Sequence, residues 1–208
     1  MENLARQTTV RIQTAKSSGS GTIVRLQGQT YTVLSNWHVV AIVRGIGLLS
    51  PMTASSTDGW EFRGGWAIPI WRSFSFAGRS SIKEHRLAPS LQRWERHGDR
   101  LGFPAGAQVW AVARGFVELL LPKSLPQGYS LSYTNEVKIG MSGDPIFNAK
   151  DFWVGINGRG KYRDPDFEVY ALEHATEPTA ELLEKMVKSC WGIPISIYLQ
   201  FVSSHLGS

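Results

Sequence analysis

The chain has 208 residues, of which 42% are hydrophobic and 19% are charged, and its formal net charge is +5. A chain of this length buries about 70% of its unfolded surface, which is enough for one domain or two small lobes. The single cysteine excludes an internal disulfide, and we expect Cys190 to be a small buried hydrophobic residue. Residues 1–19 lack the apolar core of a signal peptide, and no apolar run approaches the length of a membrane span. The sequence therefore predicts a cytoplasmic protein without a membrane partner.

Alternating apolar and polar residues predict many short strands along most of the chain. The first strands are expected at residues 8–12, 21–26 and 30–34, and a turn at 27–29 joins the last two into a hairpin. Later strands are expected at residues 108–112, 117–121, 129–133, 145–147, 152–156, 169–172 and 193–201. Short strands with Gly and Pro turns and few helices are typical of a barrel or sandwich.

Residues 61–100 interrupt this pattern. Between Trp71 and Arg100 the only β-branched residue is Ile82, so strand propensity is low. The spacing of apolar residues 87, 91 and 94 allows a short helix or a loop. Residues 72–100 also carry seven Lys/Arg and three Asp/Glu. Such a basic segment could bind nucleic acid, but we favour this function of the segment less. We do not expect a nucleic-acid partner.

A helix is expected after Pro178, a residue that suits a first helical turn. Four apolar residues share one of its faces: Leu182, Leu183, Met186 and Val187. The lysines at 185 and 188 lie near its C-terminal end, where positive charge is favourable. We interpret this segment as a surface helix that packs on the strands.

Two short segments carry reactive side chains. Ser142 lies between glycines in residues 140–143, and His38 follows the apolar segment 31–34. A hydroxyl is a poor nucleophile at neutral pH, so a neighbouring imidazole must accept its proton during attack. Glycine beside the serine allows a sharp turn and leaves N–H groups available to bind an oxyanion. The segments together predict a nucleophile and its general base, and the alternative is a turn serine and a core histidine.

These segments resemble the trypsin-like (chymotrypsin-fold) serine proteases, and specifically their bacterial branch without disulfides. Residues 18–24 and 31–40 are similar to the approach to the histidine in that family, and residues 128–143 to its serine loop. The likeness covers roughly residues 8–60 and 101–200 and fails between them. It implies an all-β fold of two six-stranded antiparallel β-barrels with a C-terminal helix. The first lobe would span residues 1–100, with 61–100 atypical, and the second would span residues 101–208.

The same resemblance implies roles for four backbone and side-chain groups. Ser142 would be the nucleophile and His38 the general base of an acyl-transfer reaction. The backbone N–H groups of Gly140 and Ser142 would bind the oxyanion that forms during attack. The two lobes would each contribute one of the reacting side chains, His38 from the first and Ser142 from the second.

A specificity pocket beside the serine is also implied. Glu136 would form its floor and favour Lys or Arg in the substrate through charge and hydrogen bonding. Asn157 and Gly158 would form its wall and keep it open. The alternative for Glu136 is a solvated residue that pairs with Lys138.

Two departures from the family concern the histidine. Where its orienting carboxylate is expected, residues 86–88 read Arg-Leu-Ala, and Glu84 is the candidate acid for the triad. Loss of that carboxylate lowers the rate by up to about 10⁴. Asp144 stands where the family usually has glycine, for positive φ or for close backbone approach. Its charge could keep His38 protonated and weaken it as a base.

Two explanations of residues 61–100 stay open: real divergence of a degenerate protease, or a coding sequence read out of frame. No Cys/His cluster has metal-ligand spacing and no phosphate-binding glycine loop is present, so we expect no metal and no cofactor. The sequence predicts a serine endopeptidase-type hydrolase that cleaves peptides or proteins through an acyl-enzyme, with a preference for basic residues. The alternative is a catalytically impaired pseudoprotease that binds peptides or proteins through the same cleft.

Overall fold

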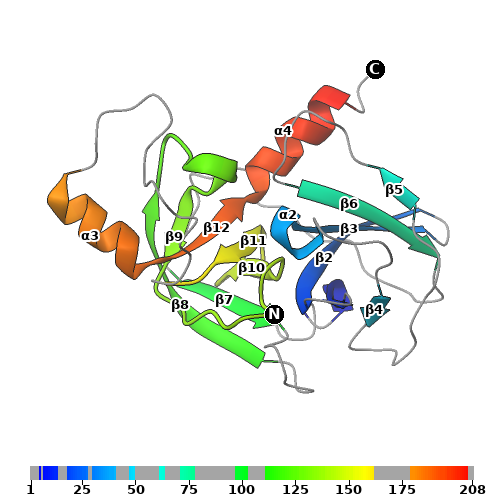
Figure 1. Cartoon of the computed structure of the whole chain (residues 1–208), viewed down its shortest axis with the longest axis horizontal. Helices are drawn as coiled ribbons and strands as arrows, with labels where there is room; N and C mark the ends of the chain where they lie inside the picture. The colour runs from blue at the N-terminus through cyan, green and yellow to red at the C-terminus, as the bar shows by residue number, and fades with distance from the viewer. Residues whose placement is uncertain are drawn as a thin grey trace.

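The computed structural model describes residues 5, 7–13, 18–27, 30–40, 47–49, 61–63, 71–77, 97–102, 111–161 and 179–205. These residues form a six-stranded sheet from the first part of the chain and a closed barrel from the second. Figure 1 shows the two side by side, with the sheet in blue and cyan and the barrel in green, yellow and orange. Within the described residues, no helix is long and apolar enough to cross a membrane.

The first sheet has the strand order β4-β1-β2-β3-β6-β5. Its strands are β1 (Thr9–Gln13), β2 (Ser18–Gln27), β3 (Thr30–Asn36), β4 (Gly47–Leu49), β5 (Glu61–Arg63) and β6 (Trp71–Ala77). The pairing of Gln27 with Thr30 confirms the predicted hairpin of β2 and β3. A single helical turn, α2 (Trp37–Val40), follows β3 directly. The core of this lobe contains Val10, Ile12, Ile23, Tyr31, Val33, Val39 and Val40.

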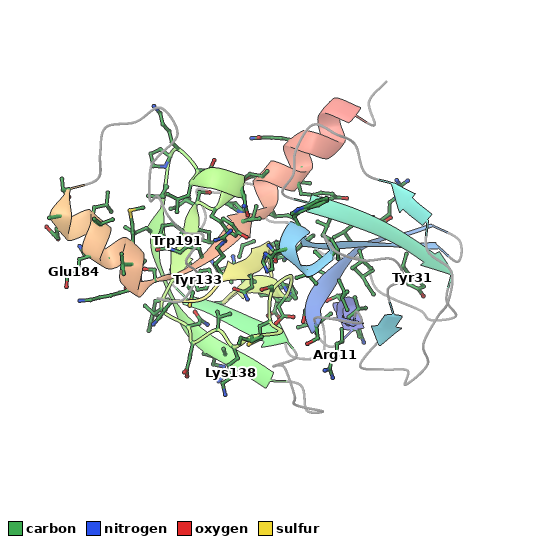
Figure 2. The ribbon with its side chains drawn as sticks, in the orientation of Figure 1. Arg11, Tyr31, Tyr133, Lys138, Glu184 and Trp191 are labelled. Atoms are coloured by element: carbon green, nitrogen blue, oxygen red, sulfur yellow. The ribbon has the colours of Figure 1, made fainter. Side chains whose placement is uncertain are left out.

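The barrel has the strand order β10-β11-β12-β9-β8-β7 and closes through pairing of β7 with β10. Its strands are β7 (His97–Gly102), β8 (Ala111–Leu120), β9 (Leu131–Tyr133), β10 (Pro145–Asn148), β11 (Trp153–Arg159) and β12 (Cys190–Pro194). A short 3₁₀ turn, η2 (Pro126–Gly128), lies between β8 and β9. Tyr133 and Trp191 are each 1% exposed, and Figure 2 shows them among the barrel strands. Burial of such large rings supplies much of the stability of a small barrel.

Two helices follow the barrel strands in the last part of the chain. Helix α3 (Ala180–Lys188) is confirmed, and the Thr179 hydroxyl caps it by accepting the Leu182 N–H at 3.3 Å. Helix α4 (Ile195–His205) occupies most of the range 193–201 in which a strand was predicted, so that prediction was wrong. The β-branched and aromatic residues there suggest a strand, but Ile195, Tyr198 and Leu199 also recur with helical spacing and share one packed cluster.

Helix α4 joins the two lobes. Its residues Ile197, Tyr198 and Leu199 pack against a cluster that also contains Leu34 of β3 and Val24 of β2. Figure 1 shows α4 running from the barrel toward the first sheet. Burial raises the pKa of the Tyr198 phenol above its ordinary value, while the charge of Arg25 on β2 lowers it. The helix thus buries apolar surface from both lobes.

The fold is mainly β, as the sequence predicted, but two closed barrels are not confirmed because the described strands of the first lobe form a sheet. Residues 61–100 contain β5, β6 and the start of β7, so strands form here although strand propensity is low from Trp71 to Arg100. Phe74 and Phe76 alternate with serine along β6, and aromatic residues favour strands as β-branched ones do. Because β7 belongs to the barrel, the expected lobe boundary after residue 100 falls inside this strand.

Two other strand predictions also differ from the structure. Residues 111–120 form one continuous strand, β8, rather than two separate strands. A bulge between Val117 and Leu119 shifts the register of its pairing with β9. The predicted strand at 169–172 and the predicted helix or loop at 87–94 lie outside the described residues.

Candidate active site

The loop between β9 and β10 carries Ser142, and backbone hydrogen bonds within the loop and to β11 hold it. The Met141 N–H donates to Lys138 O at 3.1 Å, the Gly143 N–H to Asn157 O at 2.8 Å, and the Asp144 N–H to Met141 O at 3.2 Å. The N–H groups of Gly140 and Ser142 donate to no acceptor in the part of the chain that the structure describes. Such a pair of available N–H groups, one on the serine and one two residues before it, is what an oxyanion site requires.

Ser142 itself is half-buried, and its hydroxyl donates to the carbonyl oxygen of Gly158 at 3.0 Å. A hydroxyl has one proton, so in this arrangement the proton of Ser142 is not directed toward an imidazole. Rotation of the Ser142 side chain would be needed before an imidazole could accept it. Hydrogen bonds of catalytic groups are often misaligned before substrate binds.

The serine loop lies against two strands of the first sheet. Ser20 of β2 makes two bonds to it: its N–H donates to Ser142 O and its hydroxyl to Gly140 O, both at 2.8 Å. Thr22 donates to Gly143 O at 2.9 Å. These bonds join residues more than a hundred positions apart and fix the loop against the other lobe.

Gly143 is where the loop and the first sheet come closest. A Cβ at this position would stand 1.9 Å from Ser20 O and 2.9 Å from the Ser35 hydroxyl, and the residue has φ +94°. The Ser35 hydroxyl in turn donates to Ser20 O at 2.8 Å. Only glycine allows this approach of backbone to backbone.

His38 is brought to the same boundary by β3. Ser35, which lies against Gly143, stands three residues before His38, a separation that the chain spans in at most about 11 Å. His38 belongs to α2, the helical turn that follows β3, and it is exposed to solvent. The contact of Ser35 with Gly143 thus brings the segment that ends at His38 against the segment that carries Ser142.

Ser20 is fully buried, and its replacement by alanine tests its contribution to the loop. Ser20→Ala leaves Gly140 O without its hydroxyl donor, and we expect a loss of about 1–3 kcal/mol in the free energy of unfolding, measured in urea. Ser132→Ala is the matched control, because the buried Ser132 hydroxyl has no hydrogen-bond partner among the described residues. Equal stability of the two variants would contradict a structural role for the Ser20 hydroxyl.

Asp144 occupies the expected glycine position without the backbone strain that a positive φ would impose. Its φ is not positive, unlike those of Gly140 and Gly143, and its carbonyl accepts the Asn157 N–H at 2.7 Å. The Asp144 side chain is completely buried. Positive φ at this position, which the sequence allowed, is therefore not what the fold uses.

The predicted pocket residues have different surroundings from one another. Glu136 is exposed, whereas Asn157 is completely buried and bonded to the serine loop. Gly158 packs against Tyr129, whose Cε1 would lie 2.1 Å from a Cβ at position 158. The Arg159 guanidinium lies 5.3 Å from the centroid of the same ring. Among these residues, Glu136 is the one open to solvent, and Gly158 presents its carbonyl to Ser142.

Other sequence predictions concern residues that do not meet this loop. Glu84 lies outside the described residues. Cys190 is buried as predicted, and its thiol donates to Asn135 O at 3.0 Å. No group of three His, Cys, Asp or Glu residues suitable for a metal ion occurs in the described part of the chain.

The residues that sequence reasoning missed are Ser20, Thr22 and Ser35. They bond the serine loop to the first sheet, whereas the sequence analysis noted residues 18–24 and 31–40 only for their resemblance to the family's approach to its histidine. Small polar residues among glycines in a strand are a signal that another backbone approaches closely. That signal alone could not have identified residues 140–143 as the partner.

No known family model and no curated protein matches this chain. Its fold is similar to the inactive form of the Rv3671c protease, with a TM-score of 0.67, 12% sequence identity, and coverage of 96% of this chain and 89% of that one. An inactive serine-to-alanine mutant of Rv3671c from M. tuberculosis H37Rv is similar with a TM-score of 0.65 and 12% identity, over 97% and 89%. At this identity the likeness establishes a shared protease fold and leaves the reaction open.

Proposed function

We propose that the chain is a serine endopeptidase-type hydrolase of the trypsin-like family, in its disulfide-free bacterial branch, acting on peptides or proteins. The observation that carries the proposal is the pair of N–H groups, of Gly140 and Ser142, that have no partner within the described residues. In the same loop, the N–H groups of Met141, Gly143 and Asp144 all donate hydrogen bonds to backbone carbonyls. His38, in the helical turn that follows β3, is the base that we propose for this serine.

The reaction we propose is acyl transfer from a peptide to Ser142. The hydroxyl rotates from Gly158 O to His38 and attacks the carbonyl carbon while the imidazole accepts its proton. The developing oxyanion accepts hydrogen bonds from the Gly140 and Ser142 N–H groups, and the loss of one such donor costs about 3 kcal/mol of barrier. His38 then protonates the leaving amine, and a water molecule releases the acyl group by the reverse sequence.

The finer part of the proposal is a preference for basic residues. Glu136 is exposed six residues before Ser142, so a Lys or Arg side chain of a substrate can reach its carboxylate without displacing a buried group. Because Glu136 is also solvated, this contribution to binding is expected to be small, on the order of 1 kcal/mol. The same exposure supports the alternative that Glu136 is simply a surface carboxylate.

A second candidate function rests on the hydrogen bond from Ser142 to Gly158. If this bond persists when substrate is bound, the hydroxyl is not activated, and the chain acts as a pseudoprotease that binds peptides or proteins in the same cleft. A residue that orients His38 is needed for efficient catalysis, and Glu84, the candidate for that role, belongs to the undescribed segment.

A peptide-cleavage experiment separates these functions. We expect the folded protein to cut a synthetic peptide mixture at internal bonds, with cleavage absent from Ser142→Ala, when products are identified by mass spectrometry. Enrichment of Lys or Arg before the cut supports the role of Glu136, and enrichment of acidic or aromatic residues ends it. Peptides that are bound but left intact by the wild type would favour the pseudoprotease.

A further inference from the structure

We propose that Asn157 is a positioning residue that aims the Ser142 N–H into the oxyanion site. This inference rests on the proposed function and assigns Asn157 a role different from the pocket wall expected from the sequence. The side chain of Asn157 is completely buried and both ends of its amide are engaged. It cannot offer either end to a substrate while these bonds are present.

The orientation of the Asn157 amide follows from its two partners. Its Nδ2 donates to Met141 O at 2.7 Å, and a carbonyl oxygen can only accept, so the NH₂ group must face it. Its Oδ1 accepts the Tyr133 hydroxyl at 2.5 Å on the other side. The backbone of Asn157 adds two bonds to the same loop, through Gly143 and Asp144. Asn157 is thus bonded both to the loop and to Tyr133 of β9, a residue that Figure 2 labels among the barrel strands.

The bond to Met141 O determines where the Ser142 N–H points. Met141 O and the Ser142 N–H belong to one trans peptide group, so they point in opposite directions. Holding the carbonyl toward Asn157 therefore holds the N–H away from it, on the side where the described residues give it no acceptor. The Asp144 N–H, at 3.2 Å from Met141 O, is the weaker second donor to the same carbonyl.

An aspartate at position 157 would test this geometry with almost no change in shape. A carboxylate oxygen would face Met141 O at the place of the amide, and two acceptors repel each other. The Met141–Ser142 peptide would turn, and the Ser142 N–H would leave the oxyanion site. Once protonated, the carboxyl group has an O–H that can donate to Met141 O and restore the original arrangement. Burial beside a carbonyl raises the pKa of such a carboxyl group, so restoration is expected as the pH falls.

The test is the rate of Ser142 labelling by a fluorophosphonate, measured from pH 8 to pH 5 for the wild type and Asn157→Asp. At high pH we expect the variant to react about 10²–10³ times more slowly, as for loss of one oxyanion donor. The ratio of the variant rate to the wild-type rate should then rise as the pH falls. Using the ratio at each pH removes the slowing that protonation of His38 causes in both proteins.

Asn148→Asp is the matched control. Asn148 is also a buried asparagine of the barrel, but its Oδ1 accepts the N–H groups of Lys150 and Phe152 in the turn after β10. A carboxylate keeps both acceptor functions, so the rate ratio for this variant should stay near one at every pH. A ratio for Asn157→Asp that is equally flat would overturn the inference.

A second readout does not depend on catalysis. In ¹⁵N-labelled protein, the Ser142 amide resonance of Asn157→Asp should move with the ionisation of the introduced carboxyl group and return toward its wild-type position at low pH. If the wild type does not react with the probe, the proposed function fails, and this resonance still decides the inference. An unmoved Ser142 resonance would overturn it in either case.

Tyr133→Phe is the variant that tests the inference if Asn157→Asp does not fold. It removes the hydroxyl that donates to Asn157 Oδ1 and leaves the Nδ2 donor in place. We expect a labelling rate about 3–10 times lower, as for loss of one neutral hydrogen bond, with a displaced Ser142 resonance. An unchanged rate and an unmoved resonance would overturn the inference.

Discussion

Gly143→Ala is expected to separate the serine loop from the first lobe and to cost about 4 kcal/mol or more in the free energy of unfolding. The added Cβ would lie 1.9 Å from Ser20 O, a backbone atom that cannot rotate away. A non-glycine residue at φ +94° adds on the order of 1–2 kcal/mol of strain. Moving the loop to relieve the clash would also break the bonds from Ser20 and Thr22, each worth about 1 kcal/mol.

Urea unfolding and probe labelling measure the two expected consequences of Gly143→Ala, a lower free energy of unfolding and a slower reaction of Ser142 with the probe. Gly160→Ala is the matched control, because the one described atom that a Cβ there would meet is Val137 O, at an ordinary 3.5 Å. We expect the control to stay within about 0.5 kcal/mol of the wild type. A Gly143→Ala protein as stable and as reactive as Gly160→Ala would show that the loop does not depend on this contact.

His38→Ala is expected to lower the rate of probe labelling and of peptide cleavage by about 10⁴–10⁶ while the fold is kept. His38 is exposed, so its removal should change the free energy of unfolding by at most about 0.5 kcal/mol. The loss of rate follows because no other group is expected to accept the Ser142 proton during attack.

Stability and rate must be measured on the same preparation of His38→Ala. A folded variant that reacts at the wild-type rate would mean that another group activates Ser142. A wild type and a variant that are equally unreactive would instead support the pseudoprotease, because there would be no base function to lose.

The strands around the reactive residues were predictable because their signals are local. Apolar alternation in β1, β2 and β3 reflects one buried face, and the hairpin of β2 and β3 needs only a short turn. Helix α3 was predictable because Pro178, one apolar face and the lysines near its C-terminal end agree with one another.

Elements whose conformation depends on distant parts of the chain were predicted poorly. Helix α4 has strand-forming residues, but its helical conformation lets Tyr198 and Leu199 pack with Leu34 of the other lobe. Strand β6 carries no β-branched residue, yet it pairs along its whole length with β3, from Thr30–Ala77 to Asn36–Trp71. In both cases tertiary contacts, side-chain packing for α4 and strand pairing for β6, outweighed the local secondary-structure propensity.

In the candidate site, too, the features with local sequence signals were predicted and those that depend on distant residues were not. Ser142 and His38 lie in glycine-rich and strand-end motifs that can be read locally, whereas the bonds that hold the loop cannot. Ser20 meets Gly140 across 120 positions of sequence, and no pattern in either segment encodes that pairing. Asn157 was assigned to a pocket because the motif shows its place in the chain but not the direction of its side chain.

The most direct test of the proposed hydrolase is the mass of the intact protein after reaction with a fluorophosphonate probe, with Ser142→Ala treated in parallel. An activated serine forms a covalent bond with such a probe, whereas an unactivated hydroxyl does not. We predict one adduct per chain on the wild type and none on the variant. A well-folded wild type that stays unlabelled, or a variant that is labelled equally, would contradict the assignment of Ser142 as an activated nucleophile.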